Sequence, residues 1–268
     1  MSYYNLISLM PKTAPIDPDA QAFITAASIT DPTQQSAINQ LVVDLKGYSI
    51  WSKMKAIYPF VGGTAAQHKW NLKDPRDLDA AFRLVFNGGW THSSNGATPN
   101  GTNAFANTFY NTSTQSTTSN ISAGFYSRTN TTSGGTTFGV TDGSFTGLAL
   151  VIKFTDNNTY FGANDSFLTG SGNFISNTTG LFVINRTSLT EKKMYRNGSV
   201  ISTSTPTSNG VKNDVVYLGA RRYGGYTVDS YDTRQHSFTF LGDTLSDTEA
   251  ANFYTAVQAF QTTLGRQV

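Results

Sequence analysis

Glutamate is almost missing from this sequence: among its 17 acidic residues only Glu191 and Glu249 are glutamates. Helical bundles normally place Glu and Lys on their exposed faces, so this chain is a poor candidate for such a bundle. Its polar residues are mainly 38 Thr, 26 Ser and 21 Asn, and 13% of its 268 residues are aromatic. Disordered chains are short of aromatic residues, whereas Thr, Tyr and Phe suit a pleated, half-buried surface. The composition therefore predicts a folded protein rich in strands and loops.

Charge and cysteine content exclude several classes of protein. The net charge is +2 without a basic run, so the chain lacks the electrostatic footprint of a nucleic-acid-binding protein. The absence of cysteine excludes disulfides, thiolate metal sites and thiol nucleophiles. No apolar run approaches the roughly 20 residues of a membrane span. Residues 1–15 have no cationic start and no small-residue cleavage site, so we interpret them as mature sequence.

Two short helices are predicted near the N-terminus. Asp17 and Asp31 each precede a proline, which places a carboxylate at the N-cap and proline at the first helical position. Apolar residues then recur at i, i+3, i+4 and i+7, which predicts helices over 18–29 and 32–46. A third short helix is expected near 50–57.

This N-terminal region, 1–62, has two interpretations. Two helices of this length bury little surface alone, which favours an oligomerisation or docking region. The alternative is a lid that packs locally on the rest of the chain. In either case we expect the remainder, 63–268, to form one β-sandwich.

From about residue 68 the apolar period changes to two, which is typical of strands with one buried face. Asn197-Gly198 predicts a type I′ hairpin, because both central residues of that turn need positive φ. The stretch 93–120 is polar and is interpreted as long loops. Short strands separated by turns favour an antiparallel sandwich over an α/β fold. The candidate strands are 82–86, 121–126, 148–154, 181–185, 192–196, 200–203, 215–218 and 236–241.

The end of the chain carries the clearest local signal. Ser246 and Glu249 have the spacing of a capping box. A helix over 247–264 follows, and Gly265 is placed to end it in the left-handed conformation. One apolar stripe runs along this helix, formed by Phe253, Val257, Phe260 and Leu264.

The segments 193–200 (KMYRNGSV), 216–219 (VYLG) and 238–249 (FTFLGDTLSDTE) together resemble consecutive parts of laminin-G and pentraxin-like modules. The match in order and spacing extends over about 180–264. Those modules are concanavalin A-like jelly-roll sandwiches. The resemblance therefore implies an antiparallel jelly-roll β-sandwich. Together with the helices predicted above, the expected fold is mainly β, with a short N-terminal helical region and a closing C-terminal helix.

A second resemblance covers most of the chain from about 35 to 266, apart from the variable loops. The segments 51–63, 68–76, 90–96 and 259–266 are similar to a type of protein found in tailed and other bacterial viruses. This resemblance implies a bacteriophage virion component, such as a head fibre, spike or tail fibre appendage, that carries a lectin-like domain.

Catalysis is not expected. Glycosidases usually need two suitably spaced carboxylates, and the Glu-x-Asp-x-x-Glu strand of the sandwich hydrolases does not occur. Glu249 is assigned to a helix cap, and Glu191 lies near a hairpin. Asp229 and Asp232 could replace the pair in principle, but two aspartates in a Gly/Tyr-rich loop are usually turn formers. We therefore predict a protein that is not an enzyme.

A metal site has little support, and calcium is the one alternative kept open. His68, His92 and His236 show no metal-binding spacing. Lectin-like sandwiches often bind calcium through Asp and Asn oxygens, and Asp-Asn-Asn is equally typical of a turn. No other cofactor is expected. The calcium candidates are Asp156, Asn158 and Asp165.

Two groups of residues are candidates for sugar binding, which needs aromatic faces and polar groups together. The first lies in a Gly/Tyr-rich loop and comprises Arg222, Tyr223, Tyr226 and Tyr231. The second comprises Trp90, His92 and Asn95. The alternative for both is plain packing, over a sandwich edge or in the core.

The leading hypothesis is a non-enzymatic virion protein on the particle exterior, made in the bacterial host cytoplasm, that attaches to a host-surface glycan. Its other partners would be virion proteins and copies of itself. We expect a homo-oligomer, with a trimer as one candidate, because fibres and spikes gain from avidity. The rivals are a capsid decoration or cement protein that binds no ligand and, third, an enzyme that degrades polysaccharide.

Overall fold

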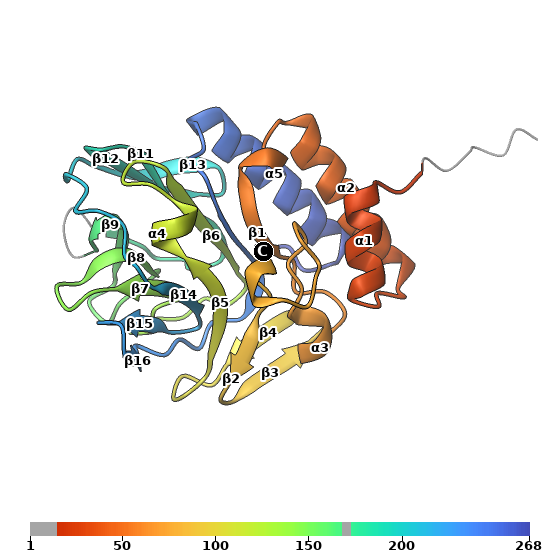
Figure 1. The fold of residues 1–268 in the computed structure, drawn as a ribbon, viewed down its shortest axis with the longest axis horizontal. Helices are drawn as coiled ribbons and strands as arrows, with labels where there is room; N and C mark the ends of the chain where they lie inside the picture. Colours follow the sequence, from red (N-terminus) through yellow and green to blue (C-terminus); the bar gives the residue numbers. More distant parts are fainter. Residues whose placement is uncertain (1–14, 168–172) are drawn as a thin grey trace, which may run out of the picture.

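The computed structural model describes residues 15–167 and 173–268. It has three layers: two β-sheets packed face to face, and helices over the outer face of one of them (Figure 1). We call the sheet under the helices the covered sheet and the other one the open sheet. The prediction that residues 1–15 are mature sequence falls, except for residue 15, outside the described residues.

The covered sheet has eight strands. In spatial order they are β13 (Ser199–Ser204), β12 (Glu191–Arg196), β11 (Gly180–Ser188), β6 (Ile121–Ser127), β17 (His236–Gly242), β4 (Gly96–Pro99) and β3 (Trp90–Ser93), with β1 (Met54–Tyr58) also on β17.

The open sheet has nine strands, and its one parallel pairing among the described strands joins β15 to β7. In spatial order they are β10 (Asn173–Phe174), β9 (Asn158–Ser166), β8 (Thr146–Val151), β7 (Phe138–Thr141), β14 (Val215–Leu218), β5 (Phe105–Asn111) and β2 (Val85–Asn87), with β15 (Arg221–Tyr223) on β7 and β16 (Thr227–Asp229) on β15.

Three long helices form the third layer, α1 (Pro18–Ala26), α2 (Pro32–Gly47) and α5 (Asp247–Thr263). Short helical turns are α3 (Ala65–His68), α4 (Thr112–Gln115), η1 (Trp51–Lys53) and η2 (Asp79–Ala81). No helix in the described ranges combines the length and apolar character needed to cross a membrane.

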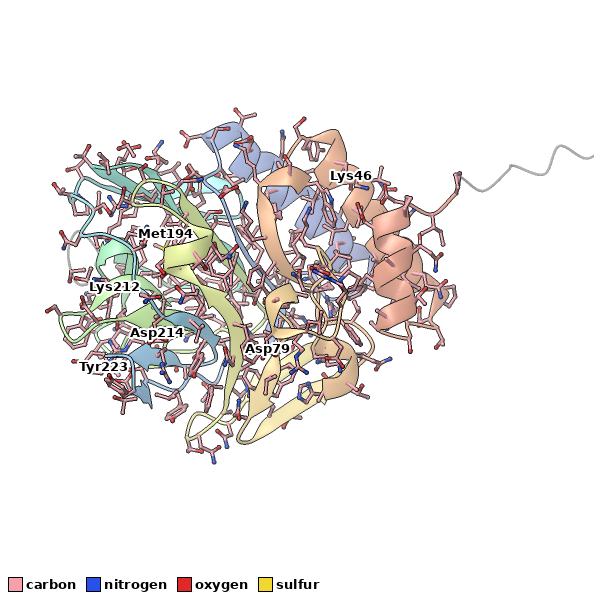
Figure 2. All side chains as sticks on the ribbon, in the orientation of Figure 1. Lys46, Asp79, Met194, Lys212, Asp214 and Tyr223 are labelled. Atoms are coloured by element: carbon pink, nitrogen blue, oxygen red, sulfur yellow. The ribbon has the colours of Figure 1, made fainter. Side chains whose placement is uncertain are left out.

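Two apolar cores hold the layers together. One lies between the sheets and includes Phe125 and Leu148, both fully buried. The other lies between the covered sheet and the helices, where Phe253 of α5 meets Phe240 of β17 with ring centroids 4.4 Å apart. Lys46 on the helical layer and Tyr223 on the open sheet lie far apart in Figure 2.

The local sequence signals are confirmed. The Asp17 and Asp31 carboxylates cap α1 and α2, and Ser246 and Glu249 form the reciprocal capping box of α5. Asn197 and Gly198 have φ of 50° and 77°, as the predicted hairpin requires. The prediction of a mainly-β antiparallel sandwich with an N-terminal helical region and a C-terminal helix is also confirmed.

Three local predictions are wrong. The segment 50–57 forms η1 and then strand β1, not a third helix, because alternate residues of β1 pack into the two different cores. The boundary predicted at residue 62 therefore leaves β1, a strand of the sandwich, in the N-terminal region. The stretch 93–120 contains β5 rather than only long loops, and most of 82–86 precedes the short strand β2.

Candidate functional site

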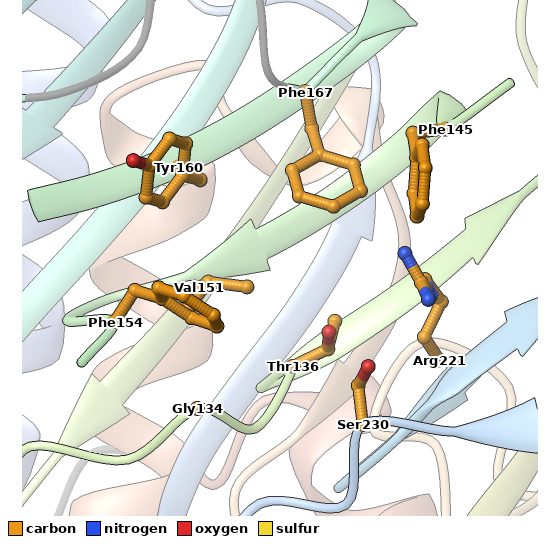
Figure 3. A pocket seen from close by; sticks show the side chains of 9 residues that line it. All are labelled: Gly134, Thr136, Phe145, Val151, Phe154, Tyr160, Phe167, Arg221 and Ser230. Carbon is orange, nitrogen blue, oxygen red and sulfur yellow. The ribbon is translucent and has the colours of Figure 1, made fainter. Parts of the chain in front are cut away.

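A hollow of about 320 Å³ lies on the outer face of the open sheet (Figure 3). Residues from β8, β9, β15 and the adjoining loops line it. They are Gly134, Thr136, Phe145, Val151, Phe154, Tyr160, Phe167, Arg221 and Ser230.

The hollow exists because the outward residues at the middle of this sheet are small. Gly139, Ala149 and Gly162 are paired in one row across β7, β8 and β9, and Arg221 continues the row on β15. Their neighbours along each strand point into the core between the sheets, so the row itself faces outward. Larger side chains around the row then lean over the sheet and enclose a space.

Aromatic side chains form the walls of the hollow. On one side Phe145 meets Phe167 edge to face, with centroids 5.5 Å apart, and Tyr223 lies 5.6 Å from Phe145. On the other side Phe154 and Tyr160 meet edge to face at 5.9 Å, and Phe154 is 40% exposed. Such faces suit the apolar side of a sugar ring.

Arg221 supplies a guanidinium at the wall. Its Nε and Nη2 donate to the two carboxylate oxygens of Asp229 at 2.8 and 2.6 Å. The guanidinium carbon lies 4.9 Å from the Phe145 centroid and 5.5 Å from that of Phe167. Its Nη1 donates to no residue in the described ranges, so this group can serve a ligand.

Two hydroxyl groups point toward the hollow, those of Thr136 and Ser230 (Figure 3). Within residues 15–167 and 173–268 neither hydroxyl has a hydrogen-bond partner. The two segments that carry them are joined directly, because Thr136 N donates to Ser230 O at 2.6 Å. The hollow thus combines aromatic walls with unused hydrogen-bonding groups.

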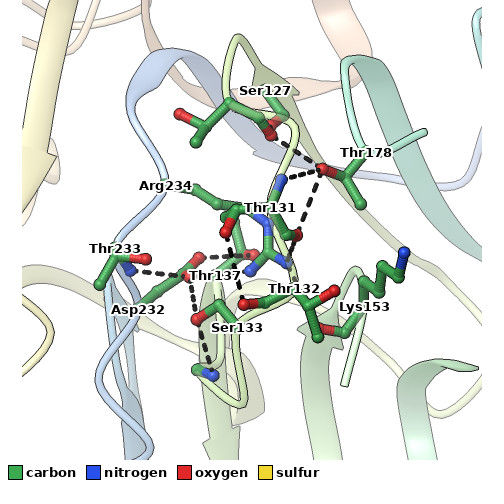
Figure 4. Close-up of polar contacts among 12 residues, drawn as sticks. Ser127, Thr131, Thr132, Ser133, Thr137, Lys153, Thr178, Asp232, Thr233 and Arg234 are labelled. Atoms are coloured by element: carbon green, nitrogen blue, oxygen red, sulfur yellow. Dashed lines mark hydrogen bonds and ion pairs between the residues drawn. The ribbon is translucent and has the colours of Figure 1, made fainter. Parts of the chain in front are cut away.

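A buried polar network joins the residues that flank Thr136 to those that follow Ser230 (Figure 4). Asp232 and Arg234, both fully buried, form an ion pair at 2.8 Å. Asp232 also accepts from Ser133 Oγ and Thr137 Oγ1, both at 3.0 Å, and Arg234 Nη2 donates to Thr131 O at 3.0 Å. Since the network bonds to residues on both sides of Thr136 and close to Ser230, it fixes the two segments that carry these hydroxyls.

Backbone strain accompanies two of the lining residues. Phe145 and Ser230 have φ of 60° and 53°, in the left-handed region that non-glycine residues rarely adopt. Asp142 Oδ1 stabilises the turn before Phe145 by accepting from Ser144 N and Thr146 N at 2.9 and 3.0 Å. Strain held in this way at a surface hollow is consistent with a binding role.

The predicted tyrosine loop lies next to this hollow, on β15, β16 and the segment after them. Tyr223 contributes its ring to the aromatic group. Arg222 Nε donates to Asp214 at 3.1 Å, and Tyr231 OH donates to Val228 O at 3.1 Å. Tyr226, at the hairpin tip, is 94% exposed. The structure therefore brings Tyr223 near the hollow, whereas Arg222 is paired with Asp214 and Tyr231 is bonded to the Val228 carbonyl.

The second predicted group lies elsewhere and does not form one surface. Trp90 and His92 on β3 pack around Phe86, at centroid distances of 5.3 and 4.7 Å. His92 Nδ1 is also 2.9 Å from Nδ1 of the buried His68. Asn95 lies in the turn between β3 and β4. Trp90 and His92 therefore pack against other side chains, as the alternative of plain packing expects.

The three calcium candidates are not brought together. Asp156 and Asn158 share a turn, in which Asp156 Oδ1 accepts from Asn158 N at 2.9 Å. Asp165 lies at the other end of β9, about 20 Å away by the rise per residue. It is buried between two cations, with Arg186 Nη2 at 3.0 Å and Lys192 Nζ at 2.7 Å.

Sequence inspection missed most of the lining residues. The available signal was the alternation of Gly139 with Phe138 and Val140, and of Gly162 with Phe161 and Ala163. Small residues on the outward face of neighbouring strands indicate a hollow only when both segments are recognised as strands. The sequence instead offers a turn or a calcium site around residue 158, and predicts no strand there.

No family model matches the chain, and no curated protein matches it. Solved structures do match at low identity. The binding domain of botulinum neurotoxin serotype D has a TM-score of 0.46 at 14% identity, covering 77% of this chain and 52% of that one. The binding domain of Paraclostridial Mosquitocidal Protein 1 has a TM-score of 0.48 at 13% identity, covering 76% and 52%.

A third match is domain 4 of AbnA, a GH43 extracellular arabinanase from Geobacillus stearothermophilus, in complex with arabinotriose. Its TM-score is 0.41 at 14% identity, covering 75% of this chain and 98% of that one. The chain thus spans about half the length of the two toxin binding domains. Because these TM-scores are below 0.5, the assignment of a β-sandwich rests on the two sheets described above.

Proposed function

We propose that the hollow on the open sheet binds a glycan on a host-cell surface and that the chain is a non-enzymatic bacteriophage virion protein, of the fibre, spike or appendage type. The observation that carries the binding role is the combination of aromatic walls with the uncommitted Thr136 and Ser230 hydroxyls and Arg221 Nη1. Sugars need both kinds of group, one for the ring face and one for the hydroxyls.

The virion role rests on the sequence resemblance over about 35–266. On this proposal the protein lies on the particle exterior, contacts other virion proteins and forms a homo-oligomer, whose several copies would raise avidity. The helical layer, on the opposite side of the molecule from the hollow, is then the face directed toward the particle.

A binding role rather than catalysis is supported by the lining itself. The nine lining residues include no Asp or Glu, so the hollow has no carboxylate pair for glycoside hydrolysis. Within the described ranges no group of three or more His, Asp or Glu side chains is placed to hold a metal ion. Release of reducing sugar from host envelopes by the purified protein would instead support the enzyme alternative.

The binding role is tested with a glycan array and host cells, using the intact chain and two variants. Phe154→Ala removes an exposed aromatic wall and should lower glycan binding at least about tenfold, since aromatic groups dominate such contacts. Tyr48→Ala is the matched control: Tyr48 is 37% exposed, close to the 40% of Phe154, but lies at the end of α2. Equal loss in both variants, or no binding by the intact chain, would contradict the proposal.

The virion role is tested separately, by locating the protein in intact particles with cryo-electron microscopy or a labelled antibody. Absence from particles would exclude it. Presence in particles together with failure to bind any glycan or host cell would favour the decoration or cement protein.

A further inference from the structure

A second hollow of about 270 Å³ adjoins the first one on the open sheet. It is formed by the turn between β7 and β8 and by the β15–β16 hairpin. Its lining includes Asp142, Gly143, Lys212, Asp214 and Gly224.

Phe145 and Tyr223, whose rings we call the aromatic ridge, lie along the chain between residues that line the two hollows. Phe145 lines the first hollow, whereas Gly143, two residues earlier, lines the second. Likewise Arg221 lines the first and Gly224 the second, with Tyr223 between them. The two rings lie 5.6 Å apart, and Tyr223 OH donates to Gly143 O at 3.0 Å, which ties the ridge together.

Each hollow is small. Pockets for small-molecule ligands span roughly 300–1,000 Å³, and the two hollows have volumes of about 320 and 270 Å³. Each is therefore of a size for one sugar unit rather than for a branched glycan. A ligand that fills both must pass over the Phe145–Tyr223 ridge, which offers aromatic surface to the linkage between units.

The charged residues that line the two hollows are all paired. Arg221 is bound to Asp229 at 2.6 Å, Lys212 to Asp142 at 2.7 Å and Arg222 to Asp214 at 3.1 Å. Three cations therefore face three carboxylates, and neither hollow presents an uncompensated positive charge to an acidic sugar. The Asp142 side chain is still 40% exposed, so its carboxylate can accept hydrogen bonds from sugar hydroxyls.

From these features we infer that the ligand is a neutral oligosaccharide of at least two units, bound across the Phe145–Tyr223 ridge with one unit in each hollow. This inference rests on the proposed glycan binding and adds the length and charge of the ligand. The site thus selects internal or terminal stretches of a neutral chain rather than a single sugar.

The experiment uses the intact chain and series of gluco-, galacto-, manno- and arabino-oligosaccharides of one to six units, with sialylated and uronic-acid-containing oligosaccharides alongside. For the series that binds, calorimetry should give an affinity that rises about tenfold or more between one unit and two or three, and then levels off. Acidic oligosaccharides should bind more weakly than neutral ones.

Gly143→Phe places a ring in the second hollow and should remove the gain with length. Gly143 is a suitable position because a Cβ there meets nothing within 4 Å and its φ is not positive. Gly47→Phe is the matched control: its Cβ also meets nothing within 4 Å, and it lies at the end of α2. The control should keep the gain with length.

The outcomes separate the inference from the proposed function. Binding of no glycan of any charge or length overturns both. Glycan binding that is lost in Phe154→Ala but does not depend on length or on Gly143→Phe overturns the inference and leaves the proposed function standing. Preferential binding of acidic oligosaccharides also overturns the inference, because it contradicts the paired charges.

Discussion

The two sheets of the sandwich differ most at their outer faces. On the covered sheet the outward residues are large and apolar, such as Leu181 and Phe238, and they are completely buried under the helices. On the open sheet the central outward residues are Gly139, Ala149 and Gly162, and the short turns α4 and η2 contact this sheet beside β5.

On the proposed function, this difference separates the face that stabilises the fold from the face that binds a ligand. Large apolar residues on a sheet face need a cover, and α2 and α5 supply it on one side of the molecule. Small residues on the other side leave a hollow, around which Phe154 stays 40% exposed. An exposed aromatic residue adds little to folding, which leaves Phe154 available for the proposed contact with a ligand.

The largest expected effect concerns the covered face. Phe253→Ala removes a fully buried ring that contacts Phe238 and Phe240, and should lower the free energy of unfolding by about 3–5 kcal/mol. Phe154→Ala, on the open face, should lower it by less than about 1 kcal/mol. Urea denaturation of both variants measures the difference. Similar losses would show that the two faces do not divide stability from binding in this way.

The next effect is a loss of stability in acid, from buried histidines at the margin of the covered sheet. Burial lowers the pKa of His68 to about 3, assisted by the charges of His92 and Arg266, and lowers that of His236 to about 4 against a small opposing effect of Asp232. Both pKa values lie below the ordinary 6.5. The unfolded chain therefore takes up protons that the folded chain does not, and stability falls as pH drops below about 6.5.

Between pH 7 and pH 5 each of the two histidines should contribute a loss of about 2 kcal/mol. Urea denaturation at the two pH values measures it. In His68→Gln, which cannot titrate, the loss should shrink by about 2 kcal/mol; the remainder comes from His236 and from His92, whose pKa burial also lowers. A variant whose stability keeps the full dependence on pH would mean that His68 is protonated in the folded protein or that other groups cause the effect.

Local signals in the sequence predicted the parts of the fold that depend on neighbouring residues. The capping box of α5 and the Asn197-Gly198 turn need only residues a few positions apart, so both are visible in the sequence. Strand β5 was missed because its inward positions include Thr108. This polar residue breaks the apolar pattern and is satisfied by donating from Oγ1 to Val216 O, 108 residues away.

The hollow was only partly predictable for the same reason. Asp165 in β9 suggested a calcium loop because its compensating charges, on Arg186 and Lys192, are distant in sequence. The lining combines residues 134–167 with 221 and 230, which meet through the parallel pairing of β15 with β7. Such a pairing leaves no local signal in the sequence. The sequence therefore predicted only the loop that contains Tyr223, and not the residues that line the hollow.

A smaller effect is expected at the start of α5, again on the covered side. Ser246 Oγ accepts from Glu249 N at 3.2 Å, and Glu249 Oε2 accepts from Ser246 N at 2.7 Å. Ser246→Ala removes half of this box and should lower the free energy of unfolding by about 1 kcal/mol. Ser144→Ala, at an exposed turn of the open sheet, should change it by less than about 0.5 kcal/mol. Equal effects in thermal and urea denaturation would contradict the assigned role of the cap.

The smallest expected effect is that of calcium on the open sheet. Both oxygens of Asp165 are held by buried cations, whose positive charge would repel Ca²⁺, and Asp156 accepts from Asn158 N and from Tyr160 OH. The carboxylates of Asp156 and Asp165 are therefore not available to bind one calcium ion together. Millimolar EDTA or added calcium should therefore shift the melting temperature by less than about 1 °C, whereas an ion bound only to the folded state would stabilise it. A shift of several degrees that Asp156→Ala abolishes would contradict this prediction and restore a calcium site at the turn before β9.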